Sequence, residues 1–252
     1  MKIHIVIPYK IPGNPVFGWE LMFCLRSIEK NFKEDFDITI IGECPDYIDK
    51  TKVNFIEHNP DFDDAFSIVN SHYYEVAKEF DNFLVVHDDM YMVNECSLSD
   101  FLEPKIIENV ASFNFSDEET KTLNEFQKRM RNAYKELKDN NLNYLKNFCA
   151  HYPFFVETPK LLELKHSINI VEKQLPFDYL YFNFFEYKGE PISDLKSGHY
   201  QLRDTKINNK AKILNHDELG YIYQPWIINL LYRLFTEPSC FEKENYVQNS
   251  TI

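Results

Sequence analysis

The chain has 252 residues, of which 27 are Lys or Arg and 40 are Asp or Glu, so its formal net charge is −13. A chain of this length can bury a sizeable core, and its negative charge argues against generic nucleic-acid binding. The five cysteines are widely spaced without a C-x-x-C pair, which argues against a disulfide framework or a thiolate zinc site. No apolar run approaches ~20 residues and no signal-peptide pattern is present, so we expect a cytoplasmic protein without a transmembrane segment.

Strand and helix patterns alternate in the N-terminal third of the chain. Short β-branched runs predict strands, and apolar residues at helical spacing predict the helices between them. This alternation predicts a mostly parallel sheet with helices on both faces, whose ligands bind beyond the carboxyl ends of the strands. The expected strands are residues 3–8, 37–42, 53–56 and 82–86, and the expected helices are residues 17–32 and a helix from about residue 64.

The alternation fades beyond residue 95, where the pattern predicts a less regular, largely helical part. The helix that stands out most has Leu123, Phe126, Met130, Tyr134 and Leu137 on one face. Further expected elements are a strand at residues 211–214, helices at residues 179–187 and 225–235, and a polar tail at residues 245–252.

Two adjacent carboxylates, Asp88 and Asp89, follow the expected strand at residues 82–86 directly. Such neighbours repel each other unless a cation or hydrogen-bond donors compensate, and oxygen ligands suit Mg²⁺ or Mn²⁺. The alternative is a turn in which an aspartate caps the next segment. The chain has only 6 glycines, so a glycine-rich phosphate loop is not expected, and side chains or a metal would have to bind a diphosphate.

A strand that ends in an acidic D-x-D-like motif, after an N-terminal V-I-P strand and a second strand followed by an acidic residue, resembles the GT-A nucleotide-diphospho-sugar transferases. The resemblance implies a single GT-A-like domain over residues 1–252, with a nucleotide-sugar half at 1–95 and an acceptor-side half at 96–244. It implies that Asp89 binds the metal and Asp88 the ribose or donor sugar. Pro8 and Tyr9 would border the base, and Glu43 would meet the base or ribose.

Three shorter stretches resemble the Stealth-type sugar-phosphate transferases of capsule synthesis. Residues 20–31 are similar to their E-L-R-Y-S-L-R-S-I-E-K-N segment, residues 87–91 to their N-D-D-M-F-F, and residues 234–242 to their F-P-x-x-S-x-F-E. The family's opening V-Y-T-W-V is replaced by Val6-Ile7-Pro8-Tyr9. We therefore expect glycosyl transfer from a nucleotide sugar, most simply a UDP-sugar, with transfer of a sugar 1-phosphate as the alternative.

This chemistry needs a further metal or phosphate ligand and, if the reaction inverts the anomeric configuration, a base for the acceptor hydroxyl. His216 is the candidate second ligand, with its neighbour Asp217 and the more distant His151 as further candidates, although a lone histidine is more often a core or capping group. Asp178 interrupts an aromatic run, where burial would raise the pKa of its carboxyl. It is therefore either a general base or the N-cap of the helix at residues 179–187.

Asn70, Arg26 and Lys10 are polar residues near the expected ligand edge, and we expect Asn70 and Arg26 to bind the donor. The acceptor can be a glycan, a lipid-linked glycan, a protein or a modified nucleic-acid base. A hypothesis of another class is a non-catalytic α/β binding or assembly module, in which the acidic pair is only a turn.

Overall fold

The computed structural model describes residues 2–13, 18–107, 123–142, 145–192, 196–198, 210–216 and 224–244. The chain divides into two compact units, and it passes between them several times. Unit 1 consists of Met1–His58, Leu84–Phe101 and Asp194–Ile252, and unit 2 consists of Asn59–Phe83 and Leu102–Ser193.

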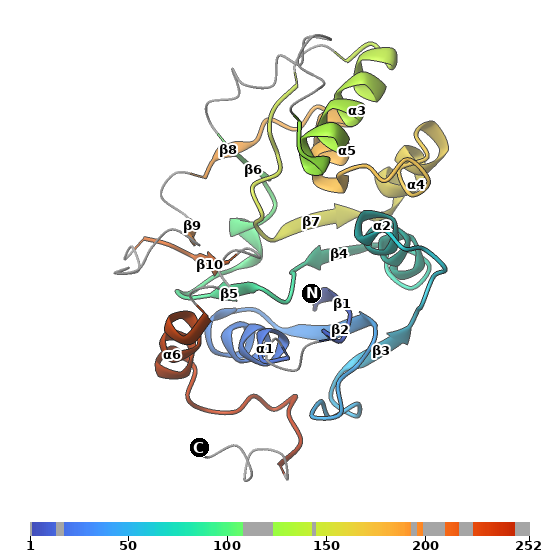
Figure 1. Ribbon diagram of the computed structural model, residues 1–252. Coiled ribbons are helices and arrows are strands. Elements are labelled where there is room, and N and C mark those ends of the chain that lie inside the picture. Colours follow the sequence, from blue (N-terminus) through green and yellow to red (C-terminus); the bar gives the residue numbers. More distant parts are fainter. Residues whose placement is uncertain are drawn as a thin grey trace. The chain divides into compact units, whose positions relative to one another are not determined.

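The central sheet has the strand order β3-β2-β1-β4-β7 (Figure 1). Strand β1 pairs in parallel with β2 and β4, and β2 pairs in parallel with β3. The side chains of Ile5, Val6 and Ile7 are fully buried, as expected for a central strand covered on both faces. The strands of this sheet are β1 (Ile3–Tyr9), β2 (Phe36–Gly42), β3 (Asn54–Glu57), β4 (Asn82–Val85) and β7 (Phe154–Glu157).

Helix α1 (Glu20–Asn31) belongs to unit 1. Two of its buried polar side chains, Ser27 and Asn31, form hydrogen bonds with strand β5 (Met90–Met92). Ser27 Oγ accepts a hydrogen bond from Met92 N at 3.0 Å, and Asn31 Nδ2 donates to Met92 O at 2.5 Å. Helix α6 (Gln224–Leu234) lies against α1, where the rings of Tyr232 and Phe23 meet edge to face at 4.8 Å. These contacts hold α1 against β5 and α6.

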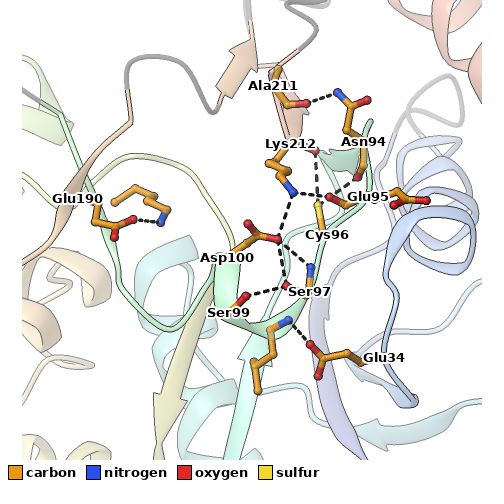
Figure 2. Close-up of polar contacts among 12 residues, drawn as sticks. Glu34, Asn94, Glu95, Cys96, Ser97, Ser99, Asp100, Glu190, Ala211 and Lys212 are labelled. Carbon is orange, nitrogen blue, oxygen red and sulfur yellow. Dashed lines mark hydrogen bonds and ion pairs between the residues drawn. The ribbon is translucent and has the colours of Figure 1, made fainter.

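A three-stranded sheet in unit 1 brings the C-terminal part of the chain to β5. Strand β10 (Ile213–Asn215) pairs antiparallel with β5 and parallel with β9 (Lys196–Gly198). Figure 2 shows how β10 is anchored: Asn94 donates to Ala211 O, and Lys212 donates to Glu95 O and lies 3.4 Å from Asp100. Asp100 is the last residue of the short 3₁₀ helix η2 (Leu98–Asp100).

Unit 2 has an aromatic core built around helix α5. The ring of Phe177 lies 4.7 Å from that of Tyr73 and 5.1 Å from that of Tyr181, centroid to centroid. These offset and tilted contacts suit the ring quadrupoles. The remaining elements are α2 (Ala65–Val76), β6 (Lys105–Ile106), α3 (Glu125–Asp139), α4 (Thr158–Ser167), α5 (Phe177–Phe184) and β8 (Glu190–Pro191), with β6 and β8 paired in parallel.

The expected α/β class with a mostly parallel sheet flanked by helices is confirmed. Helix α2 begins after Asp64, which caps it by accepting from Ser67 N at 3.0 Å. Helix α1 begins at Glu20, three residues later than expected at its N-terminus. Within the part of the chain that the structure describes, no helix combines the length and apolar character needed to cross a membrane.

Candidate metal and donor site

Asp88 and Asp89 occupy the corner of a tight turn between β4 and β5. Met90 N donates to His87 O at 3.0 Å, which closes the turn, and Val86 N donates to Val6 O at 3.0 Å, which continues the pairing with β1. Both aspartates are half-buried. The pair is therefore part of a turn, and this turn lies at the carboxyl edge of the parallel strands.

A third carboxyl, that of Glu20, faces the same turn from the start of α1. Burial, followed by the negative charges of Asp88 and Asp89, raises the pKa of Glu20 to about 8. Glu20 is only 6% exposed, and its Oε1 has no hydrogen-bond partner among the described residues. We call Glu20, Asp88 and Asp89 the acid cluster. A buried carboxyl beside two others is costly unless a proton or a cation neutralises it.

His216 lies between Glu20 and Tyr91 and contacts both side chains. His216 Nε2 lies 3.3 Å from Glu20 Oε1, which is ion-pair distance without hydrogen-bond geometry, and 3.1 Å from Tyr91 Oη. Burial, followed by the charge of Glu20, raises the pKa of Tyr91, so its hydroxyl keeps its proton. The rings of Trp19 and Tyr91 lie 5.7 and 6.1 Å from the His216 ring.

The register of β10 explains why His216 reaches this place. Asn215 is the antiparallel partner of Met90. In an antiparallel pair the residue after one partner aligns with the residue before the other, so His216 comes opposite Asp89. The role of His216 as a metal ligand stays a prediction. Its contacts with Glu20 and Tyr91 are those of a buried polar group that orients a carboxyl.

His87 adds a nitrogen beside the acid cluster. A ring nitrogen of His87 and a carboxylate oxygen of Asp89 lie within 4.8 Å of one another, close enough to bind the same cation. His87 O also accepts a hydrogen bond from the Cys24 thiol at 3.5 Å. Burial, followed by Asp88 and Asp89, raises the pKa of that thiol well above its usual range, so Cys24 stays neutral.

Pro8, Tyr9 and Glu43 lie at the same edge as the acid cluster. Pro8 and Tyr9 end β1, and Glu43 N donates to Tyr9 O at 2.9 Å. Glu43 Oε2 accepts from Ile11 N at 2.7 Å, which ties the loop after β1 to the end of β2. Burial raises the pKa of Tyr9, and Asp88 is the next largest cause, so this hydroxyl remains protonated near the turn.

Arg26 and Asn70, which were expected to bind the donor, have other partners in the structure. Arg26 is buried and its guanidinium makes a bidentate ion pair with Glu242, at 2.7 and 2.6 Å. Asn70 belongs to unit 2, where its amide donates to Ile170 O at 3.3 Å and to Leu175 O at 2.9 Å. Both side chains therefore stabilise the fold through these contacts.

Asp178 is half-buried within unit 2, and desolvation raises the pKa of its carboxyl, as expected. It accepts hydrogen bonds from Tyr179 N at 2.9 Å and from the Cys149 thiol at 3.4 Å. The N-cap prediction is wrong, because α5 starts at Phe177 with Pro176 in the cap position. The general-base role of Asp178 stays a prediction. His151 also belongs to unit 2, and Asp217 lies outside the described residues.

The sequence contained a signal for Glu20 that a purely apolar reading of α1 overlooks. Glu20, Cys24, Ser27 and Asn31 recur at helical spacing, and all four are buried. A polar stripe of this kind needs polar partners inside the fold, and the segment from His87 to Met92 supplies them for the last three. Glu20, the first member of the stripe, lies beside Asp88 and Asp89 instead.

Comparison with known proteins leaves the family of this chain open. No protein-family model matches it, and no curated protein matches it. What the chain does must therefore be argued from its own residues.

Proposed function

We propose that the chain is a metal-dependent transferase that moves a sugar from a nucleotide-diphosphate sugar, most simply a UDP-sugar, to an acceptor hydroxyl. The observation that carries the proposal is the acid cluster at the carboxyl edge of the parallel strands, with a buried Glu20 oxygen that has no hydrogen-bond partner among the described residues. A divalent cation compensates such a cluster and gives a diphosphate a binding partner.

The nature of the ligand atoms favours Mn²⁺ over Mg²⁺. Asp89 offers oxygen and His87 offers an imidazole nitrogen, and nitrogen ligands suit Mn²⁺ better than Mg²⁺, which prefers oxygen and water. A cation bound there would stabilise the negative charge that develops on the departing diphosphate. Tyr9 and Glu43 stand at the same edge, where the nucleoside of the donor would lie.

Titration calorimetry with Mn²⁺ and UDP tests the proposal directly. We expect the wild type to bind UDP only with the metal, and Asp89→Asn or His87→Ala to weaken Mn²⁺ binding at least 10-fold, because each removes a ligand. Asp63→Asn, at an exposed position of unit 2, is the matched control and should bind as the wild type does. Absence of binding with Mn²⁺ and any of the common nucleoside diphosphates would favour the non-catalytic module instead.

Transfer of a sugar 1-phosphate is a second candidate, favoured by a specific set of contacts. The three stretches that resemble the Stealth-type transferases lie in unit 1, and residues 20–31 contact both of the others: Arg26 pairs with Glu242, and Cys24 donates to His87 O. The two reactions leave different products, because glycosyl transfer releases the nucleoside diphosphate and phosphosugar transfer releases the monophosphate. Chromatography of the nucleotide formed from a UDP-sugar therefore separates them.

A further inference from the structure

The segment at residues 235–243, which we call the C-terminal brace, is attached to the middle of α1. Arg26 Nε and Nη2 donate to the two carboxylate oxygens of Glu242, and Arg26 Nη1 donates to Phe235 O at 3.2 Å. Glu242 Oε1 also accepts from Ser239 N at 2.8 Å and Ser239 Oγ at 3.0 Å. The Arg26 and Glu242 side chains are 8% and 3% exposed, so this bidentate pair is held rigidly.

The brace also reaches the start of α1 through the loop after β2. Lys243 N donates to Tyr47 O at 2.9 Å, and Asp49 N donates to Phe241 O at 2.8 Å. The Tyr47 hydroxyl in turn donates to Gly18 O at 3.1 Å. Gly18 lies two residues before Glu20, so the chain of contacts returns to the end of α1 that carries the buried carboxyl.

The first turn of α1 needs such support because it lacks a side-chain cap. Trp19 occupies the N-cap position and makes no capping hydrogen bond, so one usual source of stability is missing. The same turn holds Glu20 beside Asp88 and Asp89, whose charges oppose that of an ionised Glu20. Because this turn has no side-chain cap and holds Glu20 beside two other carboxylates, it would move away from Asp88 and Asp89 unless other contacts held it.

We propose that Tyr47 and Glu242 are positioning residues, which fix the first turn of α1 and thereby hold Glu20 beside Asp88 and Asp89 for cation binding. Glu242 fixes the middle of the helix through Arg26, and Tyr47 fixes its start through Gly18. The cation in this statement rests on the proposed function, whereas the fixing of the helix start does not.

Tyr47→Phe removes one hydroxyl and tests the inference with little change to packing. Hydrogen exchange followed by mass spectrometry should show about 10-fold faster exchange in peptides covering residues 20–24, with residues 27–31 unchanged. The Mn²⁺ affinity should fall about 10-fold, as is usual when a residue that orients a ligand is lost. Tyr187→Phe is the matched control, because its hydroxyl bonds to Glu157 in unit 2.

The two measurements separate this inference from the proposed function. A wild type that binds no Mn²⁺ contradicts the proposed function, and the exchange rates then decide alone whether the brace fixes the helix start. Unchanged exchange in both Tyr47→Phe and Glu242→Gln would overturn the inference. Faster exchange with wild-type Mn²⁺ affinity would also overturn it, because the brace would then support the helix without positioning Glu20.

Discussion

Replacing Glu20 by Gln should stabilise the metal-free protein, and more so at higher pH. The carboxyl has a pKa of about 8 in the folded protein against an ordinary value of 4.5, because it is buried beside Asp88 and Asp89. Between these values the folded state binds a proton that the unfolded state has lost, so stability falls as the pH rises. Below about pH 4.5 the carboxyl is protonated in both states and does not lower the free energy of unfolding. Above about pH 8 it is ionised in both states, and the loss of stability has reached its full size.

The size of this effect follows from the two pKa values of Glu20. Each pH unit well inside the interval lowers the free energy of unfolding by about 1.4 kcal/mol, and the change from pH 5 to pH 7 sums to about 2.5 kcal/mol. For a chain of this length, 1 kcal/mol corresponds to about 2–4 °C in the thermal midpoint. The midpoint of Glu20→Gln minus that of the wild type should therefore grow by about 5–10 °C between pH 5 and pH 7.

Differential scanning calorimetry with a chelator at pH 5, 6 and 7 measures this difference. The matched control is Glu79→Gln, because Glu79 is an exposed glutamate of unit 2, and its difference from the wild type should stay constant. A difference for Glu20→Gln that stayed constant or shrank as the pH rose would refute the reasoning. Glu20 would then not be a buried carboxyl among like charges.

Two further substitutions test the internal contacts, with stability measured by urea unfolding. Arg26→Met leaves the Glu242 carboxylate buried without its guanidinium and should cost about 3–5 kcal/mol, part of which the double change with Glu242→Gln restores; an equal or larger loss in the double variant would contradict the buried pair. Asn70→Ala removes an amide that bonds two backbone carbonyls and should cost about 1–3 kcal/mol, while leaving Mn²⁺ affinity unchanged. A loss of Mn²⁺ affinity would return Asn70 to the donor site.

The main strands were predictable because each is a continuous apolar run. Strands β1 and β2 are buried along most of their length, and no other structure suits such short β-branched segments between loops. Strand β7 and helix α4 were not predicted, because they adjoin directly: Glu157 ends the strand and also occupies the N-cap position of the helix. Without a loop or glycine between them, the change from period 2 to period 3.6 is hard to detect.

The candidate site was predictable only where residues follow strands. Asp89 lies in the turn after β4 and Glu43 comes directly after β2, so the rule for parallel sheets places them at one edge. Glu20 comes from a helix, and Arg26 lies on the same helix with a partner far along the chain. The spacing of residues predicts which of them share a helix face, but it does not predict that Glu242 forms an ion pair with Arg26.

The division of unit 1 into separate chain segments has a consequence for synthesis on the ribosome. Residues 1–58 and 84–101 emerge long before residues 194–252, which supply His216 and Glu242. Until then Arg26 has no carboxylate to pair with and β5 has no partner in β10. The nascent chain therefore carries the acid cluster on an unfinished scaffold, and unit 1 completes its fold only after the whole of unit 2 has been made.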